Sequence, residues 1–189
     1  ESIDKIKNKN INFSADIFKI HNNFSYKESL NYNLICLILF YNILDKDIYK
    51  YLKNLQDKTY LGYDTPYISL NNLKITTDKL VSLLDFDKID RAFNLNNIKS
   101  ILAIEAGSGR TSEAILSIKD NISYVICDIP PAIYISYKRL KIAFPDKKIS
   151  LLIDTNNEAE LKKKIEASDI SFIFPDHLKL LNKNFIELT

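Results

Sequence analysis

Several residue types that mark particular protein classes are scarce in this sequence. Its 189 residues include no methionine, no tryptophan and only three glycines. The two cysteines, Cys36 and Cys127, lie in separate apolar runs, which predicts reduced, buried thiols rather than a disulfide framework, and therefore a cytoplasmic protein. Twenty-six Lys and Arg against twenty-four Asp and Glu leave a formal charge of +2. Since no block of one sign stands out, nucleic acid is not an expected partner.

Long apolar runs are also missing. The most apolar window, residues 34–44, is well short of the roughly 20 residues that a membrane span needs, so we expect a core helix and no span. No export leader is visible. The two histidines, His21 and His177, have no second ligand at a recognisable spacing, which predicts no metal site. We expect His177 to be a partly exposed histidine at a helix start, with an active-site role as the alternative.

The hydrophobic content, 46%, suits one domain or one domain with a smaller cap. Residues 1–95 are predicted to form a mainly helical N-terminal cap region. Apolar residues recur at helical spacing over 26–44 and 47–55, alternate over 68–75 as in a hairpin, and resume helical spacing after Thr76 and Thr77, either of which can cap that helix.

Residues 96–189 alternate apolar runs with helical patterns. Strands are predicted over 100–104, 123–127, 149–153 and 170–174, and helices over 111–118, 132–144 and 158–165. This βαβ order predicts the α/β class, with a Rossmann-like, mostly parallel sheet and helices on both faces. Residues 185–189, FIELT, resemble the start of another strand, so we expect this sheet to be incomplete at its C-terminal end.

Two of the three glycines, Gly107 and Gly109, follow the first of these strands and lead into a helix. Such a turn lets backbone N–H groups and the positive helix end approach a polar ligand. About twenty residues further on, Asp128 ends the second strand, where a carboxylate commonly binds the two hydroxyls of a ribose. This order of a strand, a glycine turn, a helix, a second strand and an acidic residue predicts an adenosine-containing cofactor. The alternative is a plain strand-to-helix turn, with Asp128 capping a helix that begins at Pro130 or Pro131. NAD is the weaker cofactor, because Ser112 stands where a dinucleotide fingerprint has its third glycine.

Three stretches, ILAIEAGSGRTSEAIL, VICDIPPAIYISYKRLKIAFPDKKI and FIFPDHLKLL, resemble the sugar O-methyltransferases, a branch of the class I S-adenosylmethionine-dependent methyltransferases. The string DIPPAIYIS is the most specific part, and the resemblance covers residues 96–181. It implies that S-adenosylmethionine donates a methyl group to a hydroxyl of a sugar or glycan precursor. It also implies a cofactor site made by Glu105, Ala106, Gly107, Ser108, Gly109, Asp128, Ile129 and Asp176. In that site the glycines lie near the methionine part, Asp128 binds the ribose and Ile129 packs near the adenine. Asp176 either meets the adenine edge or caps the next helix, and the catalytic base is not identified.

The sequence departs from that family at the first turn. Ala103 stands where the family has an acidic residue, and Glu105 stands where it has its first glycine. The Glu105 side chain has the charge to contact the ammonium group of the cofactor and the bulk to obstruct the pocket. Three hypotheses therefore remain open: a methyltransferase, an NAD-binding module, and a degenerate, non-catalytic domain that serves as a scaffold or interaction module.

Overall fold

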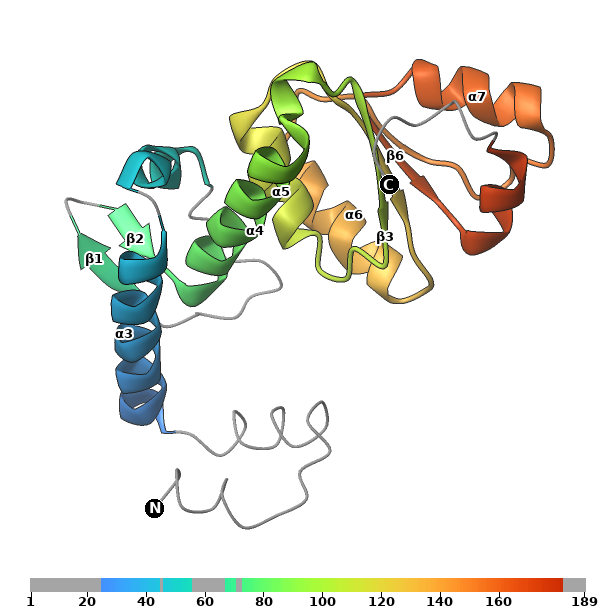
Figure 1. Ribbon diagram of the computed structural model, residues 1–189. Coiled ribbons are helices and arrows are strands. Elements are labelled where there is room, and N and C mark those ends of the chain that lie inside the picture. The colour runs from blue at the N-terminus through green and yellow to red at the C-terminus, as the bar shows by residue number, and fades with distance from the viewer. Residues whose placement is uncertain (1–24, 45, 56–66, 71–72, 182–189) are drawn as a thin grey trace, which may run out of the picture.

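The fold is known from a computed structural model, which describes residues 25–44, 46–55, 67–70 and 73–181. The helical N-terminal part and the parallel sheet lie at opposite ends, and the long helix α4 connects them (Figure 1). The elements of the N-terminal part are α3 (Tyr26–Ile43), the 3-10 helix η1 (Lys46–Asn54), the strands β1 (Ile68–Leu70) and β2 (Leu73–Ile75), α4 (Thr77–Phe93) and η2 (Leu95–Asn97). The predicted helices and hairpin are present, although the predicted helix over 47–55 is of the 3-10 type.

The second part alternates strands with helices, as its sequence pattern predicts. Its elements are β3 (Ser100–Ile104), α5 (Arg110–Ile118), β4 (Ser123–Cys127), α6 (Ala132–Ala143), β5 (Ile149–Leu151), α7 (Glu158–Glu166), β6 (Ile170–Ile173) and the 3-10 helix η3 (Pro175–Leu180). The strand β5 is two residues shorter than expected. The prediction of a further strand start at residues 185–189 falls outside the described residues.

The four strands of this part form one parallel sheet in the order β3-β4-β6-β5. Because all four run the same way, their carboxyl ends meet at one edge, which collects the residues that follow β3, β4 and β6. Within the described residues β3 pairs with β4 alone, so its other edge is open there. In doubly wound sheets the first strand usually lies inside the sheet, whereas β3, the first strand here, lies at an edge of the described sheet.

Side chains alternate between the two faces of this sheet, and helices cover both. Tyr124 and Ile126 join the core beneath α5 and α6, whereas Val125 and Cys127 join a second core with Leu161 of α7. Burial on both sides explains why β4 reads as a nearly continuous apolar run. The prediction of a parallel α/β sheet with helices on both faces is confirmed.

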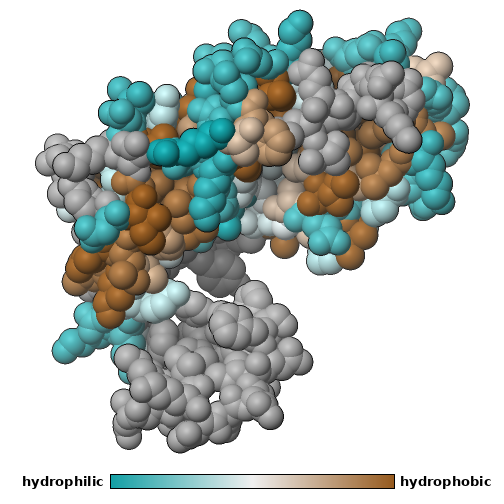
Figure 2. Space-filling model, viewed as in Figure 1, coloured by the Kyte–Doolittle hydropathy of each residue, from teal (hydrophilic) through white to brown (hydrophobic). Residues whose placement is uncertain are grey.

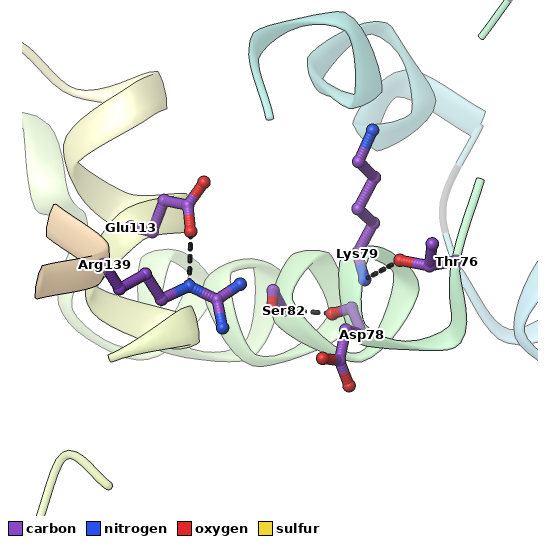
Figure 3. A network of polar contacts seen from close by, with 6 residues as sticks. All are labelled: Thr76, Asp78, Lys79, Ser82, Glu113 and Arg139. Carbon is purple, nitrogen blue, oxygen red and sulfur yellow. Dashed lines mark hydrogen bonds and ion pairs between the residues drawn. The ribbon is translucent and has the colours of Figure 1, made fainter. Parts of the chain in front are cut away.

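The helix α4 joins the helical part to the sheet. Thr76 is its N-cap, because the Thr76 hydroxyl accepts a hydrogen bond from the backbone N–H of Lys79 at 3.2 Å (Figure 3). The buried side chain of Phe86 packs in the same core as Ile101 of β3 and Ile115 of α5. Among the described helices, none is long and apolar enough to cross a bilayer.

A buried ion pair holds α5 against α6. The Arg139 Nε atom lies 2.6 Å from Glu113 Oε2, and only 14% and 4% of the two side chains is exposed (Figure 3). Breaking such a pair leaves a charge in a poorly solvated place. This ion pair therefore connects α5 and α6, which cover the same face of the sheet, within the first helical turn of α5.

We expect Arg139→Met to lower the free energy of unfolding by about 3 kcal/mol, because Glu113 then loses this buried partner. Chemical denaturation measures this value. The double variant Glu113→Leu/Arg139→Met should regain most of the loss. As a control, Lys179→Ala removes the exposed pair with Asp176 and should cost less than about 0.5 kcal/mol. Equal losses of unfolding free energy in Arg139→Met and Lys179→Ala would contradict the inferred role of the buried pair.

Candidate functional site

The turn between β3 and α5 places three residues in the left-handed region of backbone space. Glu105 and Gly107 each have a φ of +56°, and Gly109 has a φ of +74°. Backbone hydrogen bonds hold the turn: the Glu105 N–H donates to the Cys127 carbonyl, and the Gly109 N–H donates to the Ala106 carbonyl, both at 2.9 Å. For glutamate this conformation costs about 1–2 kcal/mol, whereas glycine adopts it freely.

The two glycines of the turn have different roles. A Cβ atom added to Gly107 would have no heavy atom within 4 Å, so the space over this residue is open. A Cβ atom added to Gly109 would lie 3.0 Å from Cβ of Ser136 on α6. The missing side chain of Gly109 therefore allows α5 to approach α6, and the missing side chain of Gly107 leaves room at the surface.

Asp128 connects this turn to the end of β4. Its Oδ2 atom accepts a hydrogen bond from the Gly107 N–H at 2.9 Å, and its Oδ1 atom accepts one from the Ile129 N–H at 2.8 Å. The residue is only 5% exposed. Asp128 is thus directed at the glycine turn, as the cofactor hypothesis requires. It does not cap α6, whose N-cap residue is Pro131.

A cavity of about 500 Å³ lies beside the turn, along the open edge of β3. Typical ligand pockets have volumes of about 300–1,000 Å³. One part of its wall is apolar and includes Ile89 and Phe93 of α4 with residues 101–104 of β3; the other part is the turn itself, with Glu105, Ala106, Gly107 and Ser108. Four of the eight predicted cofactor residues therefore line this cavity.

Arg110 adds a positive charge to the wall of the cavity. Its Nη2 atom lies 3.3 Å from Asp85 Oδ2 of α4, and the same oxygen accepts a hydrogen bond from the Thr111 hydroxyl at 3.1 Å. The Nη1 atom of Arg110 is buried and has no hydrogen-bond partner among the described residues. Buried donors in proteins nearly always have a partner, so this atom is an exception among the described residues.

The remaining predicted residues lie at the same edge of the sheet but outside the cavity. The Asp128 N–H donates to the Ile173 carbonyl at 3.3 Å, which joins the ends of β4 and β6. Ile129 is 60% exposed. Asp176 lies in the first turn of η3, and its side chain is 94% exposed, with Lys179 as an ion-pair partner at 3.5 Å. Neither of these two residues lines the cavity.

The environment of His177 differs from the expectation of a partly exposed side chain. It is 6% exposed, and its Nδ1 atom accepts a hydrogen bond from the Phe174 N–H at 3.0 Å, while the two rings stack. The expectation of exposure was wrong, because the ring closes the first turn of η3 instead of pointing to solvent. Among the described residues, no group of three or more His, Cys, Asp or Glu could hold a metal ion.

Asp85, Ile89, Phe93 and Arg110 are among the residues of this site that the sequence did not predict. Three of them come from α4, which is distant in the chain and shows only an ordinary amphipathic pattern. Arg110 stood next to the glycines but had no recognisable partner in the sequence. Only the packing of α4 on α5 brings Asp85 to Arg110.

Comparison of the chain with models of protein families, with curated proteins and with solved structures finds no match.

Two buried groups next to the turn favour their protonated forms. Burial raises the pKa of the Tyr124 phenol, although a hydrogen bond with Ser112 partly opposes this shift. Burial, and secondarily the negative charge of Asp128, raises the pKa of the Cys127 thiol. Both groups lose a proton less readily in the folded chain than in the unfolded chain. The stability that they contribute is therefore complete below their ordinary pKa values and is lost as the pH rises through the raised ones.

Replacing either glycine of the turn by alanine should separate their roles. Gly109→Ala should lower the free energy of unfolding by about 3 kcal/mol, because the positive φ and the contact with Ser136 both oppose a side chain. Gly107→Ala should cost only about 1 kcal/mol, since it has the unfavourable φ but open space. Thermal or urea denaturation gives both values. A Gly107→Ala loss as large as that of Gly109→Ala would mean that the two positions are equally crowded.

The pH dependence of stability should change in Tyr124→Phe. The stability of the wild-type chain should fall as the pH rises through about 10, the ordinary pKa of tyrosine, because the unfolded chain releases the phenol proton more readily than the folded one. Tyr124→Phe should lose less stability between pH 8 and pH 11. Urea denaturation at a series of pH values measures the two slopes, and identical slopes would contradict the inferred shift.

Proposed function

We propose that the chain binds S-adenosylmethionine at the carboxyl ends of β3 and β4 and acts as a sugar O-methyltransferase. The single observation that carries the proposal is the cavity beside the open Gly107, with Glu105 and Arg110 in its wall. The resemblance of the three sequence stretches to that family supports the same assignment.

The charges of the cavity fit the amino-acid part of this cofactor. An α-ammonium group needs acceptors and an α-carboxylate needs donors, and Glu105 and Arg110 offer one of each. The guanidinium of Arg110, in the wall of the cavity, has the chemistry to bind a carboxylate. The strained backbone of Glu105 is also of the kind that concentrates at binding sites. In this proposal Glu105 therefore contacts the cofactor and does not obstruct the pocket.

Asp128 would hold the ribose. Each carboxylate oxygen has two acceptor positions, and each already accepts one backbone N–H. One position on each oxygen is therefore left for the hydroxyl groups of a ribose. The backbone hydrogen bonds also fix the carboxylate in place beside Gly107.

When bound, the cofactor would supply a methyl group on a sulfonium, an electrophile for a sugar hydroxyl. The apolar wall formed by Ile89, Phe93 and β3 would exclude water from that hydroxyl. A sugar is held mostly by polar groups, and among the residues that line the described cavity Ser108 offers a hydroxyl to this end, whereas the Thr111 hydroxyl already donates to Asp85. No described residue is assigned as the catalytic base.

A degenerate, non-catalytic domain is the second candidate. The observation that favours it is the burial of Asp128, which is 5% exposed and already braces two backbone N–H groups. In that case the carboxylate would have only a structural role. NAD is a third and weaker candidate because of Ser112.

Calorimetric titration with S-adenosylhomocysteine, which binds without reacting, tests the proposal. The wild-type chain should bind it and should not bind NAD. Glu105→Gln and Arg110→Met should each weaken binding about tenfold, which corresponds to a charge-assisted contact of about 1.4 kcal/mol. Arg91→Met is the matched control, since Arg91 also pairs with an aspartate of α4 but does not line the cavity.

The outcomes separate the candidates. No binding of S-adenosylhomocysteine by a folded wild-type chain would remove the methyltransferase proposal and favour the scaffold. Binding of NAD instead would favour a dinucleotide module. Tighter binding in Glu105→Gly than in the wild type would show that Glu105 obstructs the pocket.

A further inference from the structure

The helix α4 has different surroundings along its length. Its first half belongs to the core of the N-terminal part, where Leu80 and Leu83 are buried; on the outside of that part, apolar side chains of α3 form the brown surface in Figure 2. The second half of α4 reaches the cavity, because Ile89 and Phe93 line its wall. Asp85 precedes Ile89 by four residues, so the two side chains share a face of α4. Asp85 therefore lies where the helical part meets the candidate site.

The Asp85 carboxylate contacts the two residues that begin α5. Its Oδ2 atom lies 3.3 Å from Arg110 Nη2 and accepts a hydrogen bond from the Thr111 hydroxyl at 3.1 Å. A carboxylate oxygen has two acceptor positions, so these contacts use both positions of Oδ2. The N-cap residue of α5, Gly109, makes no side-chain cap, and a negative charge near the positive end of a helix is favourable. Asp85 is thus a fixed counter-charge at the start of α5.

This carboxylate acts on the cavity through Arg110. Arg110 lines the cavity and Asp85 does not. An arginine side chain has many rotamers, and a ligand that has to fix one of them loses conformational entropy on binding. The guanidinium has five N–H donors, and the contact with Asp85 is made through Nη2, so this contact does not exhaust the group. An arginine that one acceptor already holds in a cavity wall is preorganised for a second acceptor.

The exposure of this ion pair argues against a mainly structural role. About a third of each side chain is exposed, 31% for Arg110 and 33% for Asp85. Ion pairs with this degree of exposure contribute little to stability, in contrast to the buried pair of Arg139 and Glu113. Orientation of Arg110 therefore accounts for the contact better than attachment of α4 to α5 does.

We propose that Asp85 is a positioning residue of the candidate site. It holds the Arg110 guanidinium in the wall of the cavity and thereby makes the site selective for ligands that carry an amino-acid part. This inference rests on the proposed function, in which Arg110 binds the α-carboxylate of the cofactor. It assigns to the helical part of the chain a role in ligand selectivity.

Calorimetric titration of the full-length chain with two ligands that share their nucleoside tests this role. S-adenosylhomocysteine carries the amino-acid part, and 5′-methylthioadenosine lacks it. Asp85→Ala removes both contacts with α5, whereas Asp85→Asn keeps an oxygen that accepts from the same two donors. Asp87→Ala is the matched control, because Asp87 is also an acidic residue of α4 with an arginine partner but does not line the cavity.

Asp85→Ala should weaken the binding of S-adenosylhomocysteine about fivefold, the cost of fixing one long side chain, and should leave 5′-methylthioadenosine within about twofold of the wild type. Asp85→Asn and Asp87→Ala should each keep the affinity for S-adenosylhomocysteine within about twofold, because neither removes the acceptor of Arg110. In an Arg110→Met background, Asp85→Ala should have no further effect, since it acts through that arginine.

Equal weakening of both ligands in Asp85→Ala would overturn the proposal, because it would show a general structural effect. Additive losses in the double variant Asp85→Ala/Arg110→Met, or a loss in Asp85→Asn as large as in Asp85→Ala, would overturn it as well. If Asp85→Ala does not fold, Asp85→Ser gives the same comparison, because its side chain is too short to replace the carboxylate.

Failure of the proposed function gives a different result. No binding of either ligand by a folded wild-type chain would remove the proposed function and the role of Asp85 with it. Wild-type binding of S-adenosylhomocysteine, with unchanged selectivity between the two ligands in Asp85→Ala, would remove only the role of Asp85.

Discussion

The hydrogen bonds of one buried carboxylate hold together the part of the molecule where a ligand would bind. Asp128 follows β4, yet its two oxygens accept the N–H groups of Gly107, after β3, and of its own neighbour Ile129. Without this carboxylate the N–H groups of Gly107 and Ile129 would lose their acceptor, and the turn would keep its hydrogen bond from the Glu105 N–H to the Cys127 carbonyl of β4. The space over Gly107 stays open beside this carboxylate, since an added Cβ atom there would have no heavy atom within 4 Å. Structural and binding roles of Asp128 are therefore not exclusive: a carboxylate that is already fixed loses little entropy when a ligand reaches it.

The order of the strands determines what surrounds this turn. Since β3 is at the open edge of the described sheet, the turn is flanked by β4 on one side and by α4 on the other. The helix α4 thus supplies one wall of the cavity, and its Asp85 holds the first turn of α5 through Arg110 and Thr111. The helical part of the chain is in this way a component of the candidate site and not only a cap upon it. Its own stability depends on the packing of α4 against η1 and α3.

Much of the fold could be predicted because the signals are local. Doubly buried strands such as β4 give continuous apolar runs, Thr76 gives a cap, and the turn glycines give a break in the pattern. The site could be predicted only in part, because its details depend on contacts between distant segments. Gly109 has the same sequence signal as Gly107, but the position of Ser136 on α6 gives it a packing role. The burial of His177 depends on its stacking with Phe174, and the contact of Asp85 with Arg110 depends on how α4 crosses α5. The spacing of residues within one helix or strand does not predict how side chains of different elements meet.

Glu105 is the residue at which local structure and proposed function conflict most directly. Its φ of +56° suits glycine, and a glutamate there costs about 1–2 kcal/mol. The residue has no compensating role in the core, because it is exposed and lies in the cavity wall. A residue with a strained backbone, whose side chain contributes nothing to packing, is easier to explain if the charge of that side chain is used. Arg110 supplies the opposite charge in the same wall. A cavity wall that carries both Glu105 and Arg110 suits a zwitterionic group better than an apolar one. This pair of charges is the strongest physical reason to expect a ligand with an amino-acid part.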